Sequence, residues 1–329
     1  MYRGSFVPCF EVAARADRVL LELKARPVGQ VLEPQQWDDA VLASVHSERY
    51  LRFLRTAWAQ WLALDPTNAG KDILPAVWPT RAFRSDHEPA NFSGRLGLYS
   101  FDAGTPVTAG TWEVAREGAM CAVSAAQAVL EGDRAAFSLS RPPGHHAGID
   151  FFGGYCFLNN AALAAQHLRQ NGCGRVAVLD IDYHHGNGTQ SVFYERADVF
   201  FASIHGDPRT EYPFFLGHAD EAGASAGLGT NLNLPLPRGT EFSRWSSALK
   251  VALSAVAQFR ADALVVSLGL DTFENDPISG FKLKKDDYYR IGETLAKTGL
   301  PVVFVFEGGY AVDEVGVVTV NVLQGFASN

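Results

Sequence analysis

The segment LDIDYHHGNGT, residues 179–189, concentrates ionisable side chains at the end of an apolar run. Because alternate side chains of a strand share a face, we expect Asp180, Asp182 and His184 to point the same way. Two carboxylates and an imidazole held together remain poorly satisfied unless a cation lies between them. Aspartate and histidine suit zinc and similar divalent metals. The spacing therefore predicts a metal site formed by Asp182 and His184, with Asp271 as a candidate third ligand.

A histidine pair, His145 and His146, follows the rigid sequence SRPPG. Adjacent histidines cannot both face one metal comfortably, so we expect them to handle protons beside it. Asp180 and Asn187 are the candidate partners for their second ring nitrogens. An aspartate partner raises the pKa of a histidine, whereas an asparagine orients the ring and leaves it nearer neutral, as a general base requires.

The sequence FEGGY, residues 306–310, ends another apolar run. Its two glycines allow Tyr310 to turn toward the same place, where its hydroxyl can donate to a developing oxyanion. Taken alone, Tyr310 is equally compatible with a tyrosine that closes a turn and packs on the surface. The aspartates and histidines of residues 179–189 also have a purely structural interpretation. In it, an aspartate caps a helix and the histidines are hydrogen-bonded within the protein.

The elements that carry these residues have the pattern of an α/β protein. Runs such as VAVLDI, VFFASI, ALVVSL and VVFVF are typical of strands buried on both faces, which predicts a mostly parallel sheet flanked by helices on both faces. The predicted strands are 135–140, 175–182, 198–204, 264–270 and 302–306. The predicted helices are 10–26, 47–64, 112–131, 160–170, 241–260, 286–297 and one after 310. We find no repeat or linker and predict a single domain over 1–329.

Polar clusters follow the predicted strands at their carboxyl ends. In open parallel sheets ligands bind outside those ends, so the clusters are expected to meet in one crevice. Turns that merely stop strands would explain the glycines and prolines, but not the recurring His, Asp and Tyr.

Residues 65–111 form a different kind of segment, rich in Pro, Gly, Asn and Asp with scattered aromatic residues. A long loop inside a compact domain is usually functional. It is either a plain surface insertion or, because its aromatic side chains need a packing partner, a rim or partner-contact loop.

The composition excludes several classes of protein. The chain of 329 residues has a formal net charge of −8, which argues against nucleic-acid binding. The four cysteines form no C-x-x-C pair, and the first residues contain no signal peptide, so we expect a reduced, cytoplasmic setting. No apolar run approaches the ~20 residues that a membrane helix needs.

The motifs RPPGHHAG, DIDYHHGNGT, LGLDTFENDP and EGGY, in this order, resemble the deacetylase branch of the arginase–deacetylase superfamily. The resemblance covers most of the chain from residue 135 onward. FFGGYCFLNNAA, FYERADVFFASIHGDP, DPISGFKL and the long insertion make the sequence most similar to bacterial acetylpolyamine amidohydrolases and their class II histone deacetylase-like relatives. The resemblance implies the arginase–deacetylase fold and a zinc-dependent deacetylase.

The resemblance implies a role for individual residues. It implies one zinc ion on Asp182, His184 and Asp271. It implies His146 as general base and acid, His145 paired to Asp180, and Tyr310 as oxyanion donor. A potassium ion beside the zinc is implied on Asp180, Ser203 and Ile204, and a substrate tunnel on Gly154, Tyr155, Phe215 and Leu283. It further suggests a homodimer through 65–111.

The sequence departs from the amidohydrolase pattern at two positions. The family carries two insertion glutamates that meet the distal ammonium of a polyamine, and Ser93 and Gly104 stand at those places. Asp102 is a candidate substitute. The fold of the family also opens with a strand before the YRGSF segment, and this sequence has no such strand ahead of residue 2. We therefore expect the sheet edge or the neighbouring segment that this strand would cover to be exposed.

Four functions remain in competition. The first is a zinc amidohydrolase that releases acetate from acetylpolyamines or similar small acetylated amines. The second is a protein or peptide acetyl-lysine deacetylase, which the missing glutamates favour. Arginase-like hydrolysis with two manganese ions is disfavoured by the D-x-D-x-H order, and an inert acyl-amine binding module is disfavoured by the intact His pair and Tyr310.

Overall fold

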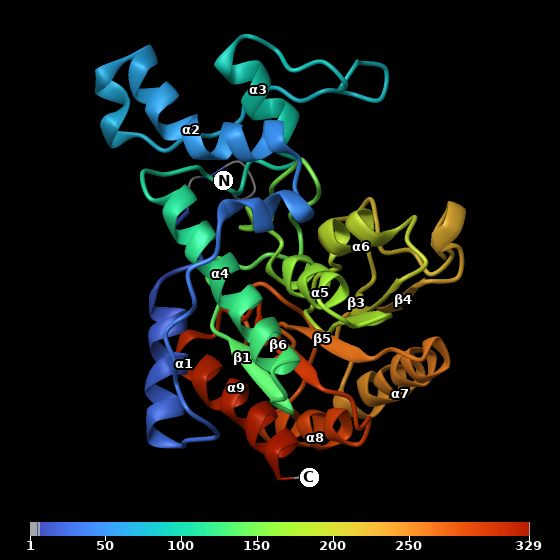
Figure 1. Cartoon of the computed structure of the whole chain (residues 1–329). Coiled ribbons are helices and arrows are strands. Elements are labelled where there is room, and N and C mark those ends of the chain that lie inside the picture. Colours follow the sequence, from blue (N-terminus) through green and yellow to red (C-terminus); the bar gives the residue numbers. More distant parts are fainter. Residues whose placement is uncertain (1–4, 6, 329) are drawn as a thin grey trace.

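The computed structural model describes residue 5 and residues 7–328, and its centre is one parallel sheet (Figure 1). The strands follow the order β1-β6-β5-β2-β3-β4, and every neighbouring pair is parallel. Their bounds are β1 Ala135–Ser138, β2 Val176–Asp180, β3 Val199–Gly206, β4 Asn231–Leu236, β5 Ala263–Leu268 and β6 Val302–Phe306. This parallel sheet agrees with the mostly parallel sheet that the apolar runs predict.

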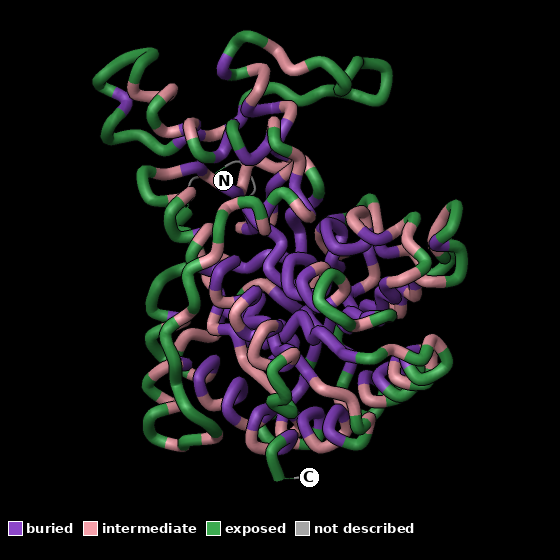
Figure 2. Tube along the Cα trace, in the orientation of Figure 1, coloured by how far each residue is buried: buried purple, intermediate pink, exposed green. Residues whose placement is uncertain are grey.

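Helices cover both faces of the sheet because its strands are apolar on both sides. Val176 and Val178 of β2 join one core cluster with α4 and α5, while Ala177 and Leu179 join a second cluster with α7, α8 and α9. Figure 2 shows the buried trace concentrated in this sheet. The helices are α1 Ala14–Ala25, α2 Glu48–Leu64, α3 Phe92–Tyr99, α4 Thr111–Leu130, α5 Asn160–Gln170, α6 Asn187–Phe193, α7 Phe242–Phe259, α8 Lys285–Ala296 and α9 Val312–Ala327.

The predicted elements are present with ends shifted by a few residues, and three others were missed. β4 has the sequence NLNLPL, whose polar positions and proline suit an edge strand that the search for apolar runs overlooks. The short helix α6 follows directly from the histidine-rich segment. The insertion 65–111 is not all loop, since it contains α3 and a 3-10 turn at Pro66–Gly70.

The sheet register aligns polar residues at the carboxyl ends of its central strands. Asp180 pairs with Ser203 of β3 on one side and with Ser267 of β5 on the other. The metal-ligand candidates follow β2 and β5 immediately. Most of the YRGSF segment lies outside the described residues, and β1 forms one edge of the described sheet.

Candidate active site

Asp182, His184 and Asp271 converge just beyond β2 and β5. Their ligand atoms all lie within 4.8 Å of one another, and all three residues are buried at this point. His184 Nδ1 lies 2.9 Å from Asp271 Oδ2 and 3.3 Å from Asp182 Oδ1. Asp271 Oδ2 is buried, and the neighbour it pairs with among the described residues is the His184 ring, without a hydrogen bond of regular geometry. A buried carboxylate oxygen that faces an imidazole and a second carboxylate fits a divalent cation.

Backbone N–H groups hold the carboxylates in place. His184 N donates to Asp182 Oδ1 over 2.9 Å, and Gly308 N donates to Asp182 Oδ2 over the same distance. Tyr183 N donates to Asp271 Oδ1 over 2.8 Å. A Cβ atom on Gly308 would lie 2.5 Å from Asp182 Oδ2, so the EGG sequence is needed for this close approach.

The histidine pair has the two partners predicted from the sequence. His145 Nδ1 lies 2.9 Å from Asp180 Oδ2, and His146 Nδ1 lies 2.6 Å from Asn187 Oδ1. The ring centroids of His145 and His146 are 4.0 Å apart, and His146 and His184 are 6.2 Å apart. The pair therefore stands beside the metal-ligand cluster.

The different partners give the two histidines opposite charge states. Burial alone lowers the pKa of His145, but the Asp180 and Asp182 carboxylates outweigh it and raise the pKa to about 10. Burial lowers the pKa of His146 well below its ordinary value, with the neighbouring charges of His145 and His184 acting in the same direction. His146 is thus neutral and able to accept a proton, whereas His145 is an imidazolium.

Glu307 holds the turn that carries the histidine pair, a role that we did not predict from the sequence. Its side chain is fully buried, and Glu307 Oε2 accepts hydrogen bonds from Gly144 N at 2.5 Å and His145 N at 3.2 Å. Burial raises the pKa of Glu307 to about 8. Its ligand atom also lies within 4.8 Å of those of His145 and Cys156. The sequence signal that could have identified this role is the position of Glu307 in the FEGGY motif.

Arg15 of α1 anchors the last loop and was also missed. The side chain is fully buried and donates to Gly309 O at 2.7 Å and to Glu307 O. Its guanidinium carbon lies 4.7 Å from the ring centroid of Tyr310. The sequence contains no signal for this role, because α1 also carries Arg18 and nothing in its pattern singles out Arg15.

Tyr310 is buried next to this anchor. Its backbone N–H donates to Asp276 Oδ2 over 2.7 Å, and its ring centroid lies 5.8 Å from that of Tyr155. Burial raises the pKa of Tyr310 well above its ordinary value. The hydroxyl consequently stays protonated and able to donate.

The predicted tunnel residues differ in their positions. Gly154 approaches His146 so closely that a Cβ atom would lie 2.2 Å from His146 Cδ2, and Leu283 is fully buried beside the loop that follows Asp271. Phe215, in contrast, is 84% exposed. Tyr212, which was not predicted, lies beside the histidines, with its ring centroid 5.1 Å from that of His146.

Asp102 is not a free rim acid. Asp102 Oδ2 accepts hydrogen bonds from Gly154 N at 2.7 Å and from the Tyr212 hydroxyl at 2.8 Å, and Oδ1 accepts one from Gly104 N at 2.9 Å. Ser93 lies in the first turn of α3. Both oxygens of Asp102 are therefore engaged within the protein.

The predicted potassium ligands lie on adjacent strands, and the side chains among them have protein partners. Asp180 Oδ1 accepts a hydrogen bond from Asp182 N at 3.1 Å, and Ser203 Oγ lies 2.8 Å from His205 Nδ1. Ser203 and Ile204 are fully buried in β3.

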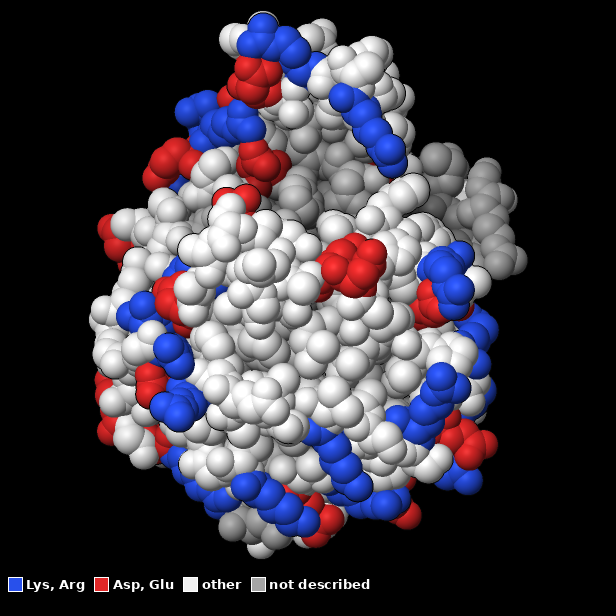
Figure 3. All heavy atoms as spheres, turned by 90° about the vertical axis from the view of Figure 1, so that its right-hand side faces the viewer, with Lys and Arg blue, Asp and Glu red and all other residues white. Residues whose placement is uncertain are grey.

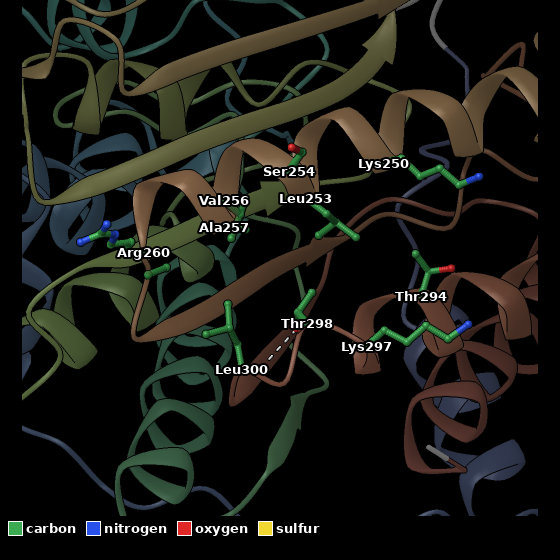
Figure 4. Close-up of a pocket in the computed structure, with 11 residues that line it drawn as sticks. Lys250, Leu253, Ser254, Val256, Ala257, Arg260, Thr294, Lys297, Thr298 and Leu300 are labelled. Carbon is green, nitrogen blue, oxygen red and sulfur yellow. Dashed lines mark hydrogen bonds between the residues drawn. The ribbon is translucent and has the colours of Figure 1, made fainter.

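A separate groove of about 500 Å³ lies between α7 and α8, near the amino ends of β5 and β6 (Figure 4). Its lining includes Lys250, Arg260, Lys297 and Leu300 and contains no Asp, Glu, His or Cys. The groove therefore has no metal ligand and no carboxylate or imidazole that could act as a general base.

On the face drawn in Figure 3, Lys and Arg are interspersed with Asp and Glu around a largely uncharged middle. None of the described helices is long and apolar enough to cross a membrane.

The candidate metal ligands, the buried histidine pair and Tyr310 follow the carboxyl ends of parallel strands, an arrangement compatible with a hydrolase. The histone deacetylase domain matches residues 9–326, and the chain belongs to this family. It is 55% identical to acetylpolyamine amidohydrolase 2 of Pseudomonas aeruginosa, over 98% of this chain and 93% of that protein. It is 48% identical to acetylpolyamine amidohydrolase of Mycoplana ramosa, over 99% and 95%. A crystal structure of the acetylpolyamine aminohydrolase of Burkholderia pseudomallei superposes with a TM-score of 0.93 at 40% identity, over 99% of this chain and 93% of the other.

Proposed function

We propose that the protein is a zinc-dependent amidohydrolase that releases acetate from acetylpolyamines or similar small acetylated amines. The observation that carries the proposal is the convergence of the buried Asp182, His184 and Asp271 side chains beside the His146–Asn187 pair. Relatives with 48% and 55% identity that are named acetylpolyamine amidohydrolases support the substrate class.

The donor set fits one zinc ion held by Asp182, His184 and Asp271. Three protein ligands with Asp and His chemistry are the usual number at a catalytic zinc, where a further position remains for water or substrate. When bound, the metal would polarise the acetamide carbonyl and acidify a water molecule.

The side chains of the protein supply the proton transfers. His146 is neutral, and Asn187 occupies its Nδ1, so Nε2 accepts the proton of the attacking water. The Tyr310 hydroxyl donates a hydrogen bond to the oxyanion that develops on the carbonyl. His146 Nε2 then returns the proton to the departing nitrogen as the C–N bond breaks, giving acetate and a free amine. The imidazolium of His145 stays protonated and balances the surrounding carboxylates.

Three further features belong to the same proposal. A potassium ion would be held by Asp180, Ser203 and the Ile204 carbonyl, behind the zinc ligands. The exposed insertion side chains Val77 and Phe83, 54% and 66% exposed, support a homodimer through 65–111. A cytoplasmic location is supported by the four cysteines, which are all free thiols.

The second candidate is a deacetylase of acetyl-lysine in proteins or peptides. Ser93 and Gly104 supply no carboxylate for a distal ammonium, and Asp102 is engaged by other groups, which favours this alternative. Both candidates use the same chemistry at the metal and differ only in the amine that enters.

The test is acetate release by the zinc-loaded protein, comparing kcat/KM for N-acetylputrescine and for an acetyl-lysine peptide. We expect the small amine to be preferred by at least about ten-fold, a difference of ~1.4 kcal/mol in transition-state stabilisation. Preference for the peptide would establish the second candidate instead. Chelation of the metal is expected to abolish release of acetate, and zinc to restore it. Turnover that survives complete metal removal would contradict the mechanism.

A further inference from the structure

The residues that form the walls beside His146 come from three distant parts of the chain. Gly154 and Tyr155 belong to the loop after the histidine pair, Tyr212 belongs to the loop after β3, and Asp102 belongs to the insertion. Asp102 Oδ2 accepts hydrogen bonds from Gly154 N and from the Tyr212 hydroxyl. Two groups that share one acceptor atom are held within two hydrogen-bond lengths of each other.

The wall formed by Gly154 and Tyr155 needs such an anchor because its backbone is strained. Tyr155 has a φ of 67° and Gly154 a φ of 55°, and the left-handed region is unfavourable for a tyrosine by about 1 kcal/mol or more. Both of their N–H groups are held by the insertion, Gly154 N by Asp102 and Tyr155 N by Thr105 Oγ1 at 3.0 Å. The Tyr155 ring, in turn, contacts that of Tyr310.

The ring of Tyr212 also lies beside His146. Its centroid lies 5.1 Å from that of His146 and 6.1 Å from that of His184, in both cases edge to face. Phe101, the neighbour of Asp102 in the chain, stacks on it at 6.0 Å. A phenylalanine would supply the same apolar surface, so the hydroxyl of Tyr212 has a specific use in its bond to Asp102.

We infer that Asp102 is a positioning residue that links the Gly154–Tyr155 loop to the ring of Tyr212 and so holds both beside His146. The inference rests on the proposed function for the nature of the substrate. The carboxylate acts on these two protein groups and not on the amine of the substrate, so its effect does not depend on a charge at the far end of the substrate.

The test compares wild type, Asp102→Ala, Tyr212→Phe and Asp86→Asn. Asp86 is the matched control, because it lies in the same insertion and its exposed carboxylate pairs with Arg84. Two substrates of similar width are used, N-acetylputrescine with a distal ammonium and N-butylacetamide without one. Tyr212→Phe keeps the ring and removes only the hydrogen bond, which covers the case in which Asp102→Ala fails to fold.

We expect Asp102→Ala to lower kcat/KM for both substrates by the same factor, roughly ten-fold or more, mainly through KM and with an unchanged pH profile. Tyr212→Phe should act in the same direction with a smaller factor, and Asp86→Asn should match wild type. A loss confined to N-acetylputrescine would overturn the inference and make Asp102 a ligand of the distal ammonium. Equal activity of all four proteins would also overturn it.

Hydrogen exchange of the backbone amides tests the positioning role of Asp102 without any substrate. We expect the amides of Gly154 and Tyr155 to exchange faster in Asp102→Ala than in Asp86→Asn, because their N–H groups lose the anchored geometry. Unchanged protection would overturn the inference. If the wild type hydrolyses neither substrate but exchange in Asp102→Ala rises as expected, the proposed function is wrong and the positioning role of Asp102 is supported.

Discussion

At the carboxyl ends of β2 and β5, Asp180, Asp182 and Asp271 are fully buried, whereas Phe83 and Phe215 around the insertion and rim are 66% and 84% exposed. Each buried carboxylate receives at least one backbone N–H, from Asp182, His184, Gly308 or Tyr183. The ring of Phe215 contacts that of Phe214, which is itself 48% exposed. The first region is determined by the sheet itself, while the second depends on loops and on whatever packs against them.

This contrast indicates how the protein separates chemistry from selection. Atoms that must keep their positions within tenths of an ångström are attached to strands and to the turns directly after them. The residues that meet the rest of the substrate are carried by the insertion and by the loop after β3. Substitutions in the first region should therefore change kcat, and those in the second should act mainly through KM.

The largest effect is expected at the end of the last strand. Tyr310→Phe removes one oxyanion donor and keeps the buried ring beside Arg15 and Tyr155, so we expect kcat to fall by about 10²–10³ with zinc still bound. Steady-state kinetics with metal analysis of the same sample measures both. Turnover within a few-fold of wild type would remove Tyr310 from the mechanism.

A smaller effect on activity is expected when His146 receives the same kind of hydrogen-bond partner as His145. Asn187→Asp places a carboxylate on His146 Nδ1, as Asp180 does for His145, and should raise the pKa of His146 by about one to three units. Because the base must be neutral, activity is lost as pH falls through its pKa, so the acidic limb of kcat/KM moves to higher pH. Asn187→Ser, which cannot add a charge, is the control. If the acidic limb of kcat/KM does not move, a group other than His146 determines it.

The smallest effect is expected at the rim. Phe215→Ala removes a ring that is 84% exposed, so we expect an unchanged Tm and a change of no more than about three-fold in kcat/KM for N-acetylputrescine. Thermal unfolding and kinetics on the same preparation test this. A loss as large as that of Tyr310→Phe would mean that Phe215 folds into the tunnel, and the contrast between the two regions would fail there.

The sequence was informative where local rules determine the position of a side chain. Apolar runs identified five of the strands, and the residues after them are brought together because parallel strands end at one edge of the sheet. The partners Asp180 and Asn187 were predicted from chemistry, and both lie within hydrogen-bonding distance of their histidines.

Other features depend on contacts that no spacing encodes. Arg15 and Glu307 meet across nearly the whole length of the chain, and Asp102 meets Gly154 and Tyr212 from a separate insertion. Tyr212 could not be distinguished from Phe215 because the direction of a loop side chain depends on the backbone, and Phe214 between them has a φ of 69°. Strand β4 was overlooked because its residues alternate between polar and apolar.

The anchor between Arg15 and the last loop has a consequence for the synthesis of the protein. Arg15 is synthesised well before the carbonyls of Glu307 and Gly309 that it binds. The candidate metal ligands and the histidine pair also precede Tyr310 in the order of synthesis. Tyr310, the proposed oxyanion donor, is thus the last of these groups to be added, and a nascent chain cannot complete the site before Tyr310 and its anchor meet.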